Sequence, residues 1–205
     1  AKASKEVHEI FRATTPLVEP IALDEAFLDV AGVARLHGDA VTIATRVRAG
    51  IHSETGLTAS VGVAPTKLVA KIASDEAKPD GMCVVLPGTE LAFLHPLPIR
   101  RLWGVGPATS AKLHRFAVRT IGDLAMLPEQ TLVAALGRAQ GAHLLALAQN
   151  RDDREVVTTR ERKSVGQEET FPRDVLDRAE LEGEVLRLAD RVGARQRADA
   201  IESRT

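Results

Sequence analysis

Two neighbouring carboxylates, Asp24 and Glu25, are the side chains of this 205-residue chain best placed to hold a cation. They interrupt an apolar run from Pro20 to Leu28 that otherwise predicts a buried strand. An ionised carboxylate in such surroundings is costly unless a positive charge compensates it. A divalent metal compensates two carboxylates at once, and Mg²⁺ and Ca²⁺ prefer oxygen ligands. The pair therefore predicts a metal site.

The spacing of this pair sets a geometric condition on that site. Adjacent residues of a regular strand point to opposite faces of the sheet. Asp24 and Glu25 can therefore reach one ion only from a hairpin tip or a bulge. The alternative is a solvated hairpin turn, since Asp is common in turns that bind no ligand. The pair alone leaves both interpretations open.

A second feature is the glycine turn Trp103–Pro107, in which Gly104 and Gly106 flank Val105. This spacing allows a tight turn with successive exposed N–H groups, and a helix that starts at Pro107 adds its positive dipole end. Such a turn can bind a phosphate without reading a base. The segment 96–122 has no Asp or Glu and five cations: Arg100, Arg101, Lys112, Arg115 and Arg119. The alternative is an ordinary helix–turn–helix corner with surface arginines.

A third feature is a group of lysines that follows a strand-to-helix passage. Lys67 and Lys71 are one helical turn apart, and Lys78 lies just past the helix end, before Pro79. A lysine held on a short, constrained loop suits contact with a polyphosphate as a point charge. The alternative is a solvated surface lysine, which is the common case.

Hydrophobic periodicity and turn residues predict the elements that position these motifs. Strands alternate with helices up to about residue 86, which predicts a mixed α/β sheet domain, and short helices follow. Residues 150–163 are rich in charge of both signs and are predicted to be a linker. Helices are predicted at 2–13, 40–54, 65–78, 89–94, 107–116, 121–127, 129–136, 141–148 and 176–198, and strands at 17–30 with the acidic interruption, 57–63, 82–86 and 164–171.

Composition excludes several classes of protein. The net charge of −1 gives no global signal for nucleic acid, so any such signal must be local. Aromatic residues make up 3% and tyrosine is absent, which argues against a base-stacking platform. The single cysteine, Cys83, excludes an internal disulfide framework and fits a reducing compartment. No apolar run reaches transmembrane length, and the first residues are not a signal peptide.

Together these segments resemble the Y-family DNA polymerases, the lesion-bypass enzymes, and specifically their DNA polymerase IV branch. The resemblance lies in residues 18–30, 60–81, 102–113 and 163–166, in matching order and spacing. It implies an α+β fold with a partial palm of mixed sheet and flanking helices at 1–86. A small all-helical thumb with a helix-hairpin-helix follows at 87–153, then a linker at 154–163 and the start of an α/β little finger at 164–205.

The resemblance also assigns roles to the motifs. Asp24 and Glu25 would ligate two catalytic Mg²⁺ ions, and Lys78 would contact the incoming triphosphate. Residues that would hold DNA phosphates are Gly104, Val105, Gly106 and Lys112. The implied activity is error-prone, template-directed nucleotidyl transfer on primer–template DNA with deoxynucleoside triphosphates, in the cytoplasm and away from membranes. A sliding clamp is an expected partner, through a C-terminal segment after Thr205.

Some parts of the family pattern have no counterpart in these residues. The first metal-ligating Asp and the fingers would precede Ala1, and most of the little finger is lacking. The 205 residues alone are therefore expected not to polymerise, whereas a parent protein would. Two rival functions stay open: a non-catalytic module that binds the DNA backbone, and another palm-type enzyme such as a nucleotide cyclase.

Overall fold

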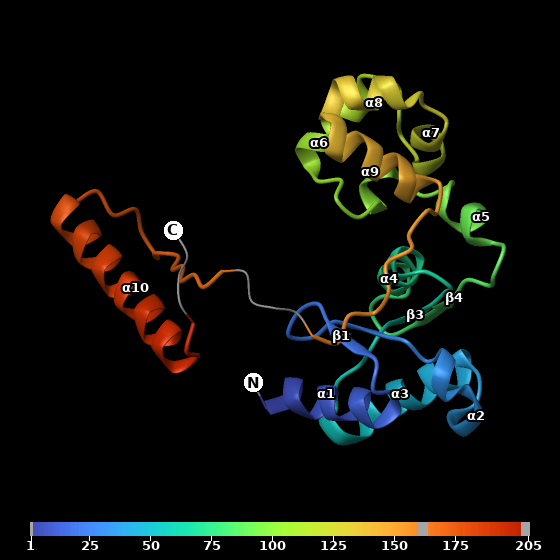
Figure 1. Ribbon diagram of the computed structural model, residues 1–205, viewed down its shortest axis with the longest axis horizontal. Coiled ribbons are helices and arrows are strands. Elements are labelled where there is room, and N and C mark those ends of the chain that lie inside the picture. Colours follow the sequence, from blue (N-terminus) through green and yellow to red (C-terminus); the bar gives the residue numbers. More distant parts are fainter. Residues whose placement is uncertain (1, 160–163, 202–205) are drawn as a thin grey trace. The chain divides into compact units, whose positions relative to one another are not determined.

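The computed structural model describes residues 2–159 and 164–201 (Figure 1). The chain divides into two compact units, residues 1–158 and 159–205. Helices dominate and short strands accompany them in the first unit, which confirms the predicted mixture of helix and sheet. Within the described residues, no helix is both long and apolar enough to span a bilayer.

The beginning of the first unit is a helix pair packed against a hairpin. Helices α1 (Lys2–Thr14) and α3 (Ala40–Thr55) contact each other, and strands β1 (Val18–Pro20) and β2 (Ala26–Leu28) pair antiparallel. Their shared core consists of Phe11, Val18, Ile43, Val47 and Ile51. The acidic pair therefore lies in the connection between two short strands.

Local signals at the ends of α3 were predicted correctly. The Asp39 carboxylate accepts a hydrogen bond from the Thr42 amide at 2.7 Å, and Gly56 ends the helix in the left-handed conformation. Two short elements before α3 were not predicted: a 3₁₀ turn, η1 (Ala31–Val33), and α2 (Ala34–His37). Segments of three or four residues are too short to show a helical period.

A second pair of strands carries the lysine helix. Strands β3 (Val61–Val63) and β4 (Met82–Val84) pair in parallel, and α4 (Lys67–Glu76) connects them. The predicted mixed sheet is therefore two separate two-stranded sheets, one antiparallel (β1 with β2) and one parallel (β3 with β4). Gly62 permits the close packing of β3 on α4, because a Cβ there would lie 2.0 Å from the carbonyl oxygen of Ala70. Helix α4 begins after Thr66, whose side chain caps it, rather than at Pro65.

A small helical part follows within the first unit. Its core is apolar and continuous with the buried face of α4, and it includes Leu68, Ile72, Leu113, Leu132 and Leu144. Five helices were predicted here and five are present, with bounds that differ by up to three residues. They are α5 (Glu90–Leu94), α6 (Pro107–His114), α7 (Ile121–Ala125), α8 (Glu129–Leu136) and α9 (Arg138–Ala148), with a 3₁₀ turn, η2 (Ile99–Arg101), before α6.

The second unit contains one long helix, α10 (Arg178–Ala198), capped by the Asp177 side chain. The predicted strand at 164–171 is wrong, because these residues have no regular secondary structure. A strand needs a hydrogen-bonded partner, and α10 is the only element between residues 164 and 201. Residues 160–163 of the predicted linker, including Lys163, lie outside the described residues.

Candidate functional site

The acidic pair lies at the tip of the β1–β2 hairpin. The Glu25 carbonyl accepts hydrogen bonds from the amides of Ile21 at 2.8 Å and Ala22 at 3.2 Å, which close the turn. Asp24 is exposed and Glu25 is half-buried. The pair thus avoids a regular strand, as the geometric condition requires.

Glu25 belongs to a cluster of two carboxylates and two lysines, Glu25, Lys71, Asp75 and Lys78, which we call the lysine–carboxylate cluster. The Lys71 ammonium lies 3.1 Å from both Glu25 and Asp75. The Lys78 ammonium lies 2.8 Å from Asp75 and 3.9 Å from Glu25. Lys78 remains 56% exposed, so its ammonium can reach a ligand from solvent.

Asp75 was not singled out by the sequence analysis. Its spacing could have revealed it, because Lys71 lies one helical turn before it and Lys78 three residues after it. Burial raises the pKa of Asp75, but hydrogen bonds and charges from Lys78 and Lys71 outweigh burial and hold that pKa below its usual range. Burial likewise lowers the pKa of Lys71, but its bonds to Glu25 and Asp75 prevail and raise it. Both groups are therefore ionised at neutral pH.

The glycine turn has the predicted local form. Gly104 has φ +93°, a conformation that favours glycine, and Gly106 precedes the first helical residue, Pro107. Val105 is buried, and its amide donates to the Leu102 carbonyl at 3.0 Å. Gly104 and Gly106 are exposed.

Lys112 lies in the last turn of α6, whereas Gly106 precedes its first turn. Lys112 follows Gly106 by six positions, which corresponds to about 9 Å along the helix axis. Lys112 is exposed. This separation favours contacts of the glycine turn and Lys112 with two neighbouring phosphates.

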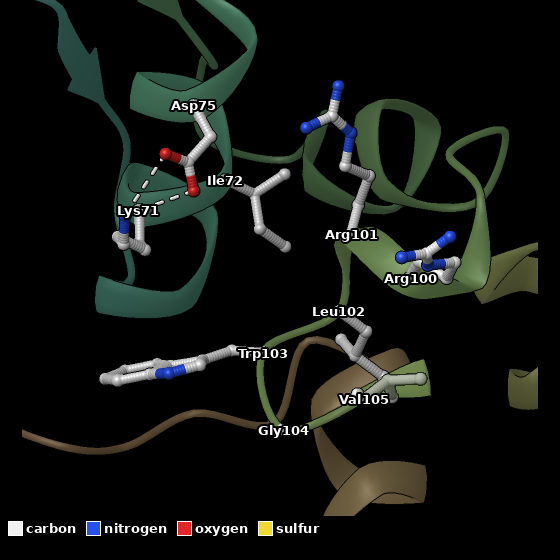
Figure 2. Close-up of a pocket in the computed structure, with 10 residues that line it drawn as sticks. Lys71, Ile72, Asp75, Arg100, Arg101, Leu102, Trp103, Gly104 and Val105 are labelled. Carbon is white, nitrogen blue, oxygen red and sulfur yellow. Dashed lines mark hydrogen bonds and ion pairs between the residues drawn. The ribbon is translucent and has the colours of Figure 1, made fainter. Parts of the chain in front are cut away.

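One groove of about 400 Å³ brings the lysine helix and the glycine turn together (Figure 2). Lys71 and Asp75 line one wall, and the segment 100–106 lines the other. Arg101 forms an ion pair with Glu76 of α4 at 2.8 Å, which ties the two walls together. The glycine turn predicted for the DNA backbone thus shares a groove with Lys71 and Asp75 of the lysine–carboxylate cluster, whereas Lys78 and Lys112 are not among the residues that line it.

The described residues supply few metal ligands. No group of three or more His, Cys, Asp or Glu side chains within 2–159 and 164–201 is arranged to hold a metal ion. Asp24 and Glu25 offer at most two carboxylates. Mg²⁺ is commonly bound through one or two carboxylates together with substrate phosphates and water, so this set fits an ion shared with a substrate.

Comparison with known proteins identifies the family. Three family models match: the impB/mucB/samB family over residues 1–75, its helix-hairpin-helix motif over 87–116, and its C-terminal domain over 162–205. DNA polymerase IV of Streptomyces coelicolor is 48% identical over 204 residues, which is 98% of this chain and 43% of that protein. The chain belongs to the Y family of DNA polymerases, in its DNA polymerase IV branch.

Other Y-family members agree with this placement. DNA polymerase IV of Desulfatibacillum aliphaticivorans is 48% identical over 202 residues, covering 98% of this chain and 51% of that protein. A chimera of the Y-family polymerases Dbh and Dpo4 is similar in structure, with TM-score 0.82 and 26% identity over 94% of this chain and 56% of the chimera. The chain spans about half the length of the curated relatives that it matches.

Proposed function

We propose that these residues form the nucleotide-phosphate and DNA-backbone part of a template-directed DNA polymerase of the lesion-bypass type. The observation that carries the proposal is the shared groove, in which Lys71 and Asp75 face the segment 100–106. A polymerase must hold a triphosphate next to a DNA strand, and this groove has cationic groups on both sides. The membership in the Y family supports the same function.

We assign the metal site to Asp24 and Glu25. Their carboxylate oxygens are the ligand type that Mg²⁺ takes, and the hairpin tip leaves Asp24 open to solvent. Two bound Mg²⁺ ions would lower the pKa of the primer 3′-hydroxyl and stabilise the pyrophosphate leaving group. The divalent requirement is implied by the family, and carboxylate oxygens are a ligand type that suits Mg²⁺.

We assign triphosphate binding to Lys78. The Lys78 ammonium lies 2.8 Å from Oδ1 of Asp75, so its charge is positioned before the nucleotide arrives. Exchange of this exposed ion pair for a phosphate contact costs little, because such pairs stabilise a protein by about 0–1 kcal/mol. In the reaction, Lys78 would neutralise the charge that develops on the departing phosphates.

We assign DNA-backbone binding to the glycine turn and to Lys112. The exposed amides near Gly104 and Gly106 and the start of α6 would hold one phosphate, and Lys112 would contact another. The Val105 amide is engaged with Leu102, so Val105 would contribute by keeping the turn in shape. Contacts of this type supply affinity without sequence preference, and they weaken as the salt concentration rises.

Primer–template DNA and deoxynucleoside triphosphates are the partners that this function requires. Among similar solved structures is one described as an insertion ternary complex of Dbh DNA polymerase, with TM-score 0.70 and 28% identity. Recruitment by a sliding clamp and a location in the cytoplasm belong to the same proposal.

Steady-state nucleotide incorporation by the full-length protein tests the assignment of Lys78. Replacement Lys78→Ala is expected to raise the KM for the nucleotide about tenfold or more, because one charge-assisted phosphate contact is worth roughly 1.5–3 kcal/mol. DNA affinity should not change. Lys5→Ala, which removes another exposed lysine, is the matched control. An unchanged KM in Lys78→Ala would remove Lys78 from the site, and nucleotide turnover without DNA would favour a cyclase instead.

A further inference from the structure

The segment after α9 was predicted as the start of a charged linker, but its first residues are held against the first unit. Asp152 is central: its side chain is only 1% exposed. Its Oδ2 accepts a hydrogen bond from the Leu68 amide at 2.8 Å, in the first turn of α4. A carboxylate at this position satisfies a free amide and complements the positive end of the helix dipole.

Arg154 connects this carboxylate to the glycine turn. Its guanidinium group donates to both carboxylate oxygens of Asp152, with an Nη2–Oδ2 distance of 2.9 Å. The same guanidinium lies over the indole ring of Trp103, 5.0 Å from the ring centroid. Trp103 directly precedes Gly104, so a short chain of contacts runs from the start of α4 to the turn. We call Leu68, Asp152, Arg154 and Trp103 the joint.

Further contacts hold the same segment in place. The Thr66 hydroxyl donates to the Asn150 side chain at 3.2 Å, and the Lys67 ammonium donates to the Glu155 carbonyl at 3.1 Å. The Val157 amide donates to the Glu19 carboxylate at 2.8 Å. These contacts fix the segment 150–157 to β1 and to the start of α4. From this segment, Arg154 contacts the Trp103 ring. In Figure 1 this segment follows α9 and continues past α4 towards β1.

We propose that Asp152 and Arg154 are positioning residues that set the place of the glycine turn relative to α4. The turn and α4 form the two walls of the groove, so the joint would fix the width of the groove and the place of the phosphate-binding amides. The expected change in DNA affinity rests on the proposed function, whereas the expected change in the position of the glycine turn does not. Neither side chain needs to touch DNA or nucleotide for this role.

The joint has a built-in probe, because Trp103 is the only tryptophan of the chain and tyrosine is absent. Fluorescence excited at the red edge of the tryptophan band therefore reports on Trp103 alone. Trp103 is 40% exposed, so Arg154 shields part of a ring that solvent can reach. Removal of the guanidinium should leave the indole with its contact to the Phe27 ring, 6.4 Å away between centroids, but should loosen it and open one face to a neutral quencher.

The experiment compares wild type with Arg154→Ala, Arg154→Lys and the control Arg151→Ala, whose side chain is an exposed arginine outside the joint. In Arg154→Ala we expect lower Trp103 anisotropy and an acrylamide quenching constant about twofold higher, with unchanged far-UV circular dichroism. Arg154→Lys should give a partial effect, because lysine lacks the planar fork that pairs with a carboxylate. Arg151→Ala should match wild type. Unchanged anisotropy and quenching in Arg154→Ala would overturn the proposal.

A DNA-binding measurement tests the second half of the proposal. We expect Arg154→Ala to bind primer–template DNA about fivefold more weakly, which is the loss of about 1 kcal/mol. The salt dependence should keep its slope, because no phosphate contact is lost. A lower slope would show that Arg154 itself binds phosphate and would overturn a positioning role. Absence of DNA binding in wild type would refute the proposed function, and the fluorescence change would still decide whether the joint holds the turn.

Discussion

The buried ion pair between Glu19 and Lys67 gives the sharpest stability prediction. The Glu19 side chain is 3% exposed and that of Lys67 is 10% exposed, and the ammonium contacts Oε2 of Glu19 directly. The pair joins β1 to the start of α4. Replacement Lys67→Met keeps the length of the side chain but removes the ammonium that contacts this buried carboxylate.

The expected cost can be worked out from this burial. Removal of one partner from a buried pair costs about 3–5 kcal/mol. Lys67 also lies over the Phe27 ring, 4.9 Å from its centroid, and loss of that contact adds about 0.5–2 kcal/mol. Glu19 still accepts a hydrogen bond from the Val157 amide and still interacts with the charge of Arg154, and these contacts recover part of this cost. We therefore expect Lys67→Met to lower the free energy of unfolding by about 3 kcal/mol.

The double variant Glu19→Gln/Lys67→Met separates charge from packing. It removes both charges at similar volume, and the glutamine oxygen can still accept from the Val157 amide. We expect it to lie within about 1 kcal/mol of wild type, since replacing both members of a buried pair is often close to neutral. The coupling between the two positions should then be about 2 kcal/mol or more.

Urea unfolding followed by Trp103 emission measures these values, because Trp103 belongs to the first unit and reports its transition. An exposed ion pair would cost about 0.2–1 kcal/mol on removal of one partner. A loss below about 1 kcal/mol in Lys67→Met would therefore refute the description of this pair as buried. A double variant as unstable as the sum of the two single variants would refute the coupling.

Three further predictions concern packing, pH and DNA. Gly62→Ala should destabilise the first unit by about 3 kcal/mol in thermal unfolding, because its Cβ would lie 2.0 Å from the Ala70 carbonyl oxygen. Gly32→Ala is the control: a Cβ there meets nothing within 4 Å, so this variant should be nearly as stable as wild type. Burial raises the pKa of Asp152, but Arg154 and the Leu68 amide outweigh it and hold that pKa below its usual range. The ionised Asp152 carboxylate therefore contributes its full stabilisation at neutral pH, and this stabilisation is lost as the pH falls below about 4. The difference in unfolding free energy between wild type and Asp152→Asn should shrink over that range. A difference that stays constant with pH would contradict this prediction. Lys112→Ala should weaken binding equally for unrelated DNA sequences and lower the salt slope by about 1, and sequence-dependent losses would speak against a phosphate contact.

Much of the fold could be predicted because its signals are local. Asp39 and Gly56 mark the ends of α3 by their own chemistry, and Pro107 marks the start of α6. The period of a strand limited Asp24 and Glu25 to a hairpin tip or a bulge if they share an ion, and the structure has them in the connection between β1 and β2. Such signals depend on neighbours in sequence, which the sequence displays directly.

The features that were missed depend on contacts between distant residues. Asp152 and Leu68 are 84 positions apart, and a charged segment gives no sign that one of its carboxylates is buried. Asp75 had a readable helical spacing, but its role depends on Glu25 from a different element. The predicted strand at 164–171 failed for a related reason, since strand formation depends on a partner that local sequence does not reveal.

Loss of the Asp24 carboxylate tests the central claim most directly. Single-nucleotide incorporation on a primer–template is measured for the full-length protein, for Asp24→Ala, and for Glu54→Ala, which removes an exposed carboxylate from α3. We predict that Asp24→Ala lowers the incorporation rate by about 10³-fold, because metal stabilisation of the reacting groups is worth several kcal/mol. DNA affinity should be retained, and Glu54→Ala should match wild type. Incorporation by Asp24→Ala within a few-fold of wild type would contradict the assignment of a catalytic metal to the hairpin tip.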